Sequence, residues 1–218
     1  EPLWQGAAPY IFATFIIGST AFIHLLLGRL WVTITMIAVN LSAGLITVYL
    51  WDHFLRQYQK DRIMTFLDPE SDRLGSGWNI IQSKIAIGSG GLTGKGFLGG
   101  TQTKYEFLPA AHTDFIFSVI GEELGFVGAL VVLALFFFII TRALQIGAMV
   151  KNRFYSLIAI GLASMLTFHV FVNIGMTIGV MPVTGLPLPF LSSGGSSLLS
   201  NLVAIGLLLH IYTYRHEY

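Results

Sequence analysis

Stretches of about twenty consecutive apolar residues recur along this 218-residue sequence and leave it few possible folds. The stretches span approximately residues 7–27, 31–51, 124–146, 154–180 and 197–214. A bilayer core of about 30 Å is crossed by about 20 residues of α-helix. Only 11% of the residues are charged, whereas soluble domains carry about 25%. The sequence therefore predicts an all-α, polytopic membrane domain covering residues 1–218, with about five transmembrane helices.

Composition excludes several classes of function. The formal net charge is +1, and nucleic-acid binding requires a concentrated basic surface that this chain lacks. Cysteine is absent, which excludes disulfides, thiolate metal sites and cysteine nucleophiles. The histidines other than His112 show no metal-ligand spacing, so we expect no metal site; they are His24, His53, His169, His210 and His216. The chain opens with Glu1 and Pro2, without a methionine or a basic leader, and we expect it to be a fragment.

Residues 52–113 form a long polar segment between the second and third predicted spans. Branched and aromatic residues recur in it, including Ile80, Ile85, Phe97 and Phe107, so we expect an ordered loop packed over the helix ends. Residues 53–67 alternate basic and apolar residues at helical spacing, which predicts that the second helix continues along the membrane surface. The short connections are basic, which favours an external position for the long segment.

Residues 88–100 contain seven glycines. They match neither a dinucleotide fingerprint, since no strand–turn–helix context surrounds them, nor a P-loop. Two interpretations remain open. The run is either a compact loop with solvated lysines, or a cradle of amide groups for a phosphorylated or sugar ligand. Lys84, Lys95 and Lys104 flank the run; we expect Lys95 to be solvated.

Asp114 lies where an apolar helix is expected to begin, next to His112 and Thr113. Thr113 or Asp114 could cap that helix. Alternatively, a carboxylate at a membrane boundary could act as a general base, because partial burial would bring its pKa closer to the working pH. The spacing of Asp114, Ser118 and Glu122 would place them on one side of a helix.

Residues 181–197 contain three prolines, which preclude a regular helix, yet their apolar residues keep them near the membrane. Irregular backbone at this depth requires protein or water around it. Ser196 or Ser197 could cap the last helix, whose N-terminus would suit an anion; an ordinary connection is equally compatible. We interpret His169 and Asn173 as side chains that form hydrogen bonds between helices.

Several ordered motifs together resemble the SEDS family, which comprises RodA, FtsW and SpoVE. The motifs are residues 66–70 (FLDPE), 82–91 (QSKIAIGSGG), 107–109 (FLP), 112–117 (HTDFIF), 173–176 (NIGM) and 187–196 (PLPFLSSGGS). Lys84 and the stretch 99–102 favour the RodA branch. Ser193 stands where the family commonly has tyrosine, and the amino-terminal half of the family pattern is missing.

The resemblance implies a fold of about ten spans, of which this chain would supply the carboxy-terminal half. It implies an inverting glycosyltransferase of the bacterial plasma membrane. The enzyme would polymerise lipid II, release undecaprenyl pyrophosphate, and serve cell elongation and shape. It also implies that Asp114 is the essential aspartate, that the long segment is external, and that the carboxy terminus is cytoplasmic. The implied partner is a class B penicillin-binding protein, which crosslinks the product.

From resemblance and chemistry together, we expect Asp114 to be catalytic. We expect substrate contacts from Lys84, Gln102, Lys104, His112, Thr113, Ser192 and Ser196. Lys84, Lys104 and the serine turn 192–197 should then face the same cavity as Asp114, and this cavity should open sideways to lipid. A divalent cation could assist the departing pyrophosphate, and the sequence leaves this open. Competing interpretations are a transporter or flippase of lipid-linked precursors, and a non-catalytic scaffold.

Overall fold

The computed structural model describes residues 18, 28, 30–72, 75–104, 107–108 and 110–213, and the regular secondary structure in this part of the chain is helical. Four of its helices are long and apolar enough to cross a membrane. They correspond to the last four of the predicted spans. The first predicted span, residues 7–27, lies almost wholly outside the described residues. The chain divides into two compact units, residues 1–60 and 61–218.

In the first unit, α2 occupies Leu30–Tyr49 and continues into a π-helical turn at Leu50–Phe54. The chain then becomes extended at Leu55, with φ −78° and ψ 127°. A separate helix, α3, begins at Gln57 and ends at Leu67, so that most of it belongs to the second unit. The prediction that residues 53–67 continue the second helix is therefore correct about helix but wrong about continuity, and their position relative to a membrane stays a prediction. A helix does form there, but an extended residue separates it from the span.

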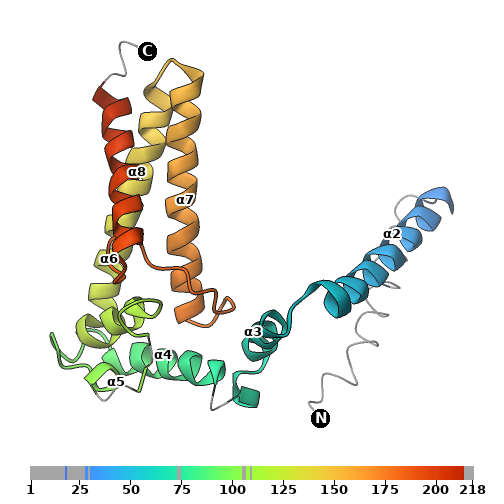
Figure 1. The fold of residues 1–218 in the computed structure, drawn as a ribbon, viewed down its shortest axis with the longest axis horizontal. Coiled ribbons are helices and arrows are strands. Elements are labelled where there is room, and N and C mark those ends of the chain that lie inside the picture. Colours follow the sequence, from blue (N-terminus) through green and yellow to red (C-terminus); the bar gives the residue numbers. More distant parts are fainter. Residues whose placement is uncertain are drawn as a thin grey trace. The chain divides into compact units, whose positions relative to one another are not determined.

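In the second unit, three long helices lie side by side (Figure 1). They are α6 (Ile116–Met149), α7 (Arg153–Thr177) and α8 (Gly195–Thr213). The polar segment that precedes them contains a 3₁₀ turn (Pro69–Asp72), α4 (Ser76–Gly90) and α5 (Thr101–Lys104). The polar segment is thus largely structured. Its position relative to a membrane stays a prediction.

A tight hairpin joins α6 to α7. The Asn152 side chain caps α7 by accepting a hydrogen bond from the amide of Phe154 at 2.9 Å. Small side chains then let the two helices approach closely, since Ala143, Ala159 and Ala163 are at most 1% exposed. Close packing of small residues is a general means of joining helices in lipid, where no hydrophobic driving force acts between them.

At the other end of the bundle, α4 lies crosswise against α6 and α7 (Figure 1). Its buried Ser83 hydroxyl donates to the carbonyl of Thr177 on α7 at 2.7 Å. Ser83 also lies 2.6 Å from the buried hydroxyl of Ser118 on α6. A hydroxyl has only one proton to donate, so Ser118 donates to Ser83. This chain of hydrogen bonds ties α4 to both long helices.

The helix α6 is broken at Gly125, where φ is 67° and ψ is −163°. The break leaves the carbonyls of Glu122 and Glu123 without their helical donors, Phe126 and Val127. The glycine-rich loop supplies replacements, because the amides of Lys95 and Gly96 donate to these two carbonyls at 3.0 and 2.9 Å.

The exchange is reciprocal. The freed amides of Phe126 and Val127 donate to the loop carbonyls of Gly91 and Leu92 at 2.9 and 3.1 Å. A Cβ at Gly125 would overlap the Gly94 amide, and it would lie 2.7 Å from the Leu92 oxygen. Glycine is therefore required on both sides of this contact.

We predict that Gly125→Ala destabilises the protein by about 2 kcal/mol or more. Its backbone conformation is almost exclusive to glycine, and the added methyl group would force the loop away from α6. Thermal unfolding of the purified protein in detergent measures the effect. The control is Gly161→Ala, in regular helix of α7 with nothing within 4 Å of the new methyl group; there we expect a gain of up to about 1 kcal/mol. Equal unfolding temperatures for the two variants would contradict the prediction.

Candidate functional site

The Asp114 segment is a tight turn that precedes α6. The amides of Thr113, Asp114 and Phe115 all point at the carbonyl of Ala110, at 3.1 to 3.3 Å. The N-cap position of α6 is Phe115, and no side chain caps the helix there. The hypothesis that Thr113 or Asp114 caps this helix is therefore wrong, which removes the structural explanation for an aspartate at this position.

The serine turn after α7 docks onto this segment. Ser192 is buried, and its hydroxyl donates to the Thr113 carbonyl at 2.6 Å while accepting from the Leu188 amide at 2.7 Å. The amide and the hydroxyl of Ser193 both donate to the His112 carbonyl at 2.8 Å. The serine turn therefore lies beside the Asp114 segment, whereas the shared cavity that opens to lipid stays a prediction. Their contacts run through the backbone of the Asp114 segment.

Asn173 binds the next backbone carbonyl along the chain, that of Asp114. Its fully buried side-chain amide donates to the Asp114 carbonyl at 2.9 Å and to the Leu186 carbonyl at 2.7 Å. Asn173 was expected to join helices; instead it joins α7 to two loops. His169, expected to act with it, has a buried Nδ1 without a partner in the described part of the chain. Three successive carbonyls, at residues 112, 113 and 114, are therefore fixed.

None of these contacts involves the Asp114 carboxylate. The residue is partly exposed, and its carboxylate has no hydrogen bond or ion pair among the described residues. Its Oδ2 lies beside the turn at Gly185, 3.4 Å from the position a Cβ would take there. A carboxylate on a fixed backbone, with free acceptor oxygens, is suited to remove a proton from a bound hydroxyl.

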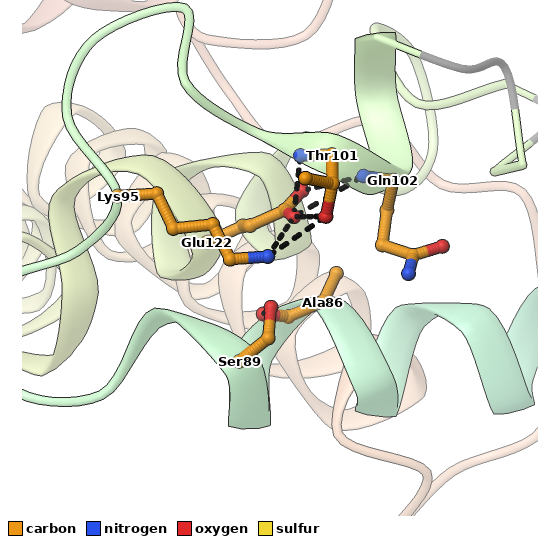
Figure 2. Close-up of polar contacts among 6 residues, drawn as sticks. All are labelled: Ala86, Ser89, Lys95, Thr101, Gln102 and Glu122. Atoms are coloured by element: carbon orange, nitrogen blue, oxygen red, sulfur yellow. Dashed lines mark hydrogen bonds and ion pairs between the residues drawn. The ribbon is translucent and has the colours of Figure 1, made fainter.

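Ser118 and Glu122, which were expected to share a helix face with Asp114, instead take part in buried contacts within the protein. Ser118 belongs to the buried contact with α4. Glu122 is fully buried and is bound by the glycine-rich loop and α5 (Figure 2). Its Oε1 pairs with Lys95 Nζ at 2.7 Å and accepts from the amides of Thr101 and Gln102 at 2.7 and 3.1 Å.

This network bears on the expected role of Lys95 and on the glycine-rich run. Lys95 is an exposed residue, as expected, but its ammonium also pairs with Glu122, and its side chain is 27% exposed. The amides that bind the Glu122 carboxylate belong to Thr101 and Gln102 of α5, and the glycine-rich loop contributes the ammonium of Lys95. The loop amides of Lys95 and Gly96 donate to backbone carbonyls instead. Gln102 belongs to that network and has a buried Oε1 without a partner in the described part of the chain.

The remaining predicted contacts divide as follows. Lys84 is exposed on α4, and its Nζ would lie 2.5 Å from a Cβ on Gly179, just after α7. Ser196 lies exposed within the first turn of α8, which begins at Gly195. The hypothesis that Ser196 or Ser197 caps α8 is therefore wrong. His112 is exposed and Thr113 is partly exposed beside Asp114. The side chain of Lys104 lies outside the described residues.

Sequence reasoning missed two contributors to this arrangement, Ser193 and Gly185. Ser193 had been noted only as a departure from the family pattern, yet it makes two hydrogen bonds to His112. Gly185 has φ 75°, and a glycine between prolines is the signal that could have marked the turn. Within the described residues, no group of three or more His, Asp and Glu side chains is placed to hold a metal ion.

Comparison with known proteins places this arrangement in a family. A model of the FtsW/RodA/SpoVE family, described as cell cycle protein, matches residues 10–217. The chain belongs to this family. Together with the four apolar helices, membership makes it a multi-pass membrane protein. The resemblance noted from the motifs is thus confirmed.

Two curated relatives illustrate the similarity. The chain is 51% identical over 197 residues to "Peptidoglycan glycosyltransferase MrdB" of Escherichia coli (strain K12), covering 90% of this chain and 53% of that protein. It is 47% identical over 193 residues to "Peptidoglycan glycosyltransferase RodA" of Treponema pallidum (strain Nichols), covering 86% and 44%. The chain therefore spans about half the length of these relatives.

A solved structure agrees with the fold. It is described as "Structural coordination of polymerization and crosslinking by a peptidoglycan synthase complex". The match has a TM-score of 0.64 and 37% sequence identity, and it covers 100% of this chain and 58% of the other. This FtsW/RodA/SpoVE chain thus shares its helical arrangement with a component of that complex.

We predict that Glu122→Gln destabilises the protein by about 2 kcal/mol, because it removes a buried charge that several donors stabilise. Chemical or thermal unfolding in detergent measures the loss. The matched control is the adjacent Glu123→Gln, because no side-chain hydrogen bond or ion pair of Glu123 is present among the described residues. A similar loss in both variants would show that the network around Glu122 contributes little.

Proposed function

We propose that this protein is a peptidoglycan glycosyltransferase that polymerises lipid II, with Asp114 as its general base. The observation that supports this most is the free carboxylate of Asp114 on a backbone held at three successive carbonyls. The similarity to two proteins named peptidoglycan glycosyltransferase supplies the reaction.

In the proposed reaction, Asp114 accepts the proton of a sugar hydroxyl as the hydroxyl oxygen attacks the anomeric carbon of a second lipid-linked sugar. The bond from that carbon to the pyrophosphate oxygen breaks, and undecaprenyl pyrophosphate leaves as an anion. The leaving group needs charge stabilisation rather than a proton, so one carboxylate suffices. A single displacement inverts the anomeric centre. Asp114 then returns its proton to water.

Lys84 is the cation we assign to the leaving pyrophosphate. Lys95 already pairs with Glu122, whereas the ammonium of Lys84 has no hydrogen bond or ion pair among the described residues. Electrostatic stabilisation where charge develops is usually a large part of catalysis. His112, Thr113, Ser192 and Ser196 would lie around the bound sugars, with Ser192 acting through the Thr113 backbone.

The proposal extends to orientation and partner. The polar segment 52–113 would face the cell exterior, where the polymer is needed, and the carboxy terminus would face the cytoplasm. A class B penicillin-binding protein would crosslink the product. The description of a synthase complex that coordinates polymerisation with crosslinking supports such a partner.

We predict that Asp114→Asn abolishes polymerisation while leaving folding and membrane insertion intact. Asparagine preserves the shape and the backbone contacts but cannot accept the proton. The assay uses purified protein containing this sequence, reconstituted with labelled lipid II, and measures glycan chains on a gel. Near-normal polymer from the variant would refute the role of Asp114. Lipid II that crosses the bilayer without polymerising would instead support a flippase.

Asn173 is a positioning residue in this scheme, and Asn173→Ala should lower the polymerisation rate about tenfold. The substitution removes two hydrogen bonds worth about 1 kcal/mol each, so the Asp114 carbonyl is released. We expect kcat to fall with KM little changed. The control is Asn201→Ala on α8, where the buried amide bonds only to Ser197. Equal kcat values in the two variants would contradict the positioning role.

A further inference from the structure

An apolar groove of about 280 Å³ runs between α6 and α7 and ends at the turn that follows α7. Leu133 and Ile140 line it from α6, and Phe171 lines it from α7. Ile178 and Val180 line its end. The lining is almost wholly hydrocarbon, with Thr167 as its one hydroxyl-bearing residue.

The ammonium of Lys84 lies next to the residues that line one end of this groove. Gly179 lies between Ile178 and Val180, and the Lys84 side chain occupies the space that a side chain on Gly179 would need, with Nζ at 2.5 Å from that Cβ position. Lys84 is itself fixed to this end, because the neighbouring Ser83 donates to the Thr177 carbonyl. An exposed ammonium therefore adjoins a hydrocarbon groove.

A second cavity of about 270 Å³, lined by α6 and α8, has a cation that already has a hydrogen-bond partner. Its cation, Arg142, already donates to Gln145 at 2.9 Å. The groove beside Lys84, by contrast, adjoins a cation that has no hydrogen bond or ion pair among the described residues.

We propose that the groove between α6 and α7 holds the polyprenyl chain of a lipid-linked pyrophosphate, with Lys84 against its phosphates. The inference rests on the proposed function, and it adds the place of the lipid chain. Lysine binds phosphate as a compact point charge. Because bilayer lipid is as apolar as the groove, burial of the chain there adds little affinity. The groove instead directs the chain, and Lys84 supplies most of the attraction.

The test is direct binding, measured by native mass spectrometry of the purified protein in detergent on the Asp114→Asn background, where turnover does not interfere. The probes are undecaprenyl pyrophosphate, undecaprenol and phosphatidylglycerol. The variants are Lys84→Gln and Val180→Trp; Val180 is 64% exposed, so a larger side chain fills the groove without entering the core. The matched controls are Lys151→Gln, in the connection from α6 to α7, and Val203→Trp on α8, which is 54% exposed.

We expect Lys84→Gln to weaken binding of undecaprenyl pyrophosphate about tenfold and to leave undecaprenol unchanged. We expect Val180→Trp to weaken both prenyl probes by a few-fold, and both controls to match the parent. If Lys84→Gln binds undecaprenyl pyrophosphate as tightly as Lys151→Gln does, the head-group contact is overturned. If Val180→Trp binds both prenyl probes as tightly as Val203→Trp does, the site for the chain is overturned. Phosphatidylglycerol binding as tightly as undecaprenyl pyrophosphate would show a general anionic-lipid site and overturn the assignment.

Failure of this inference is separable from failure of the proposed function. Polymerisation that survives Asp114→Asn refutes the general base and leaves the binding result standing. Conversely, Asp114→Asn could be inactive while Lys84→Gln and Val180→Trp leave lipid binding unaltered. That result refutes only the groove.

Discussion

The structure depends on how it satisfies the backbone groups released at Gly125. A helix near lipid cannot leave amides and carbonyls unpaired, because each costs several kcal/mol there. The loop 91–96 supplies two donors and two acceptors in their place. The break consequently becomes a rigid junction, and the first turns of α6 are held between α4 and the loop. Asp114 precedes those turns directly, so the junction fixes where the carboxylate stands.

The same arrangement explains why Glu122 can be charged and buried while Asp114 can remain free. Burial of a carboxylate is tolerated only when charge and hydrogen bonds compensate for lost water. Lys95, Thr101 and Gln102 provide that compensation at Glu122. Asp114 is partly exposed, so water compensates it in place of a partner. Two carboxylates eight residues apart thus have opposite roles, one structural and one available for chemistry.

Much of the fold could be predicted from the sequence, because the period and length of apolar runs report helices that lie in lipid. The last four spans were placed to within a few residues, except that α6 begins at Ile116 rather than near residue 124. The charges of Glu122 and Glu123 obscured that start. Nothing in the sequence alone indicated that loop amides would pair with the carbonyls of these two residues, since such pairing is set by tertiary contact.

The proximity of two candidate segments was predictable from the sequence, but their connections were not. Asp114 and the serine turn were paired correctly, because a substrate with one reacting centre requires convergent groups. Their link through the His112 and Thr113 carbonyls could not be foreseen, since backbone acceptors leave no trace in residue identity. For the same reason, Asn173 was correctly expected to form hydrogen bonds, but its acceptors were not.

The two lysines next to the glycine-rich loop differ in whether a carboxylate pairs with them: Lys95 pairs with Glu122, and Lys84 has no such partner among the described residues. The ammonium of Lys95 and the amides of Thr101 and Gln102 are already occupied by the Glu122 carboxylate. Displacing this buried carboxylate would leave these donors without partners. A phosphate ligand therefore gains nothing by replacing Glu122 among these donors. Lys84 carries its charge where no described carboxylate reaches it, at the end of a hydrocarbon groove. An amphiphile with an anionic head satisfies both features at once, whereas a free sugar or a neutral lipid would satisfy only one.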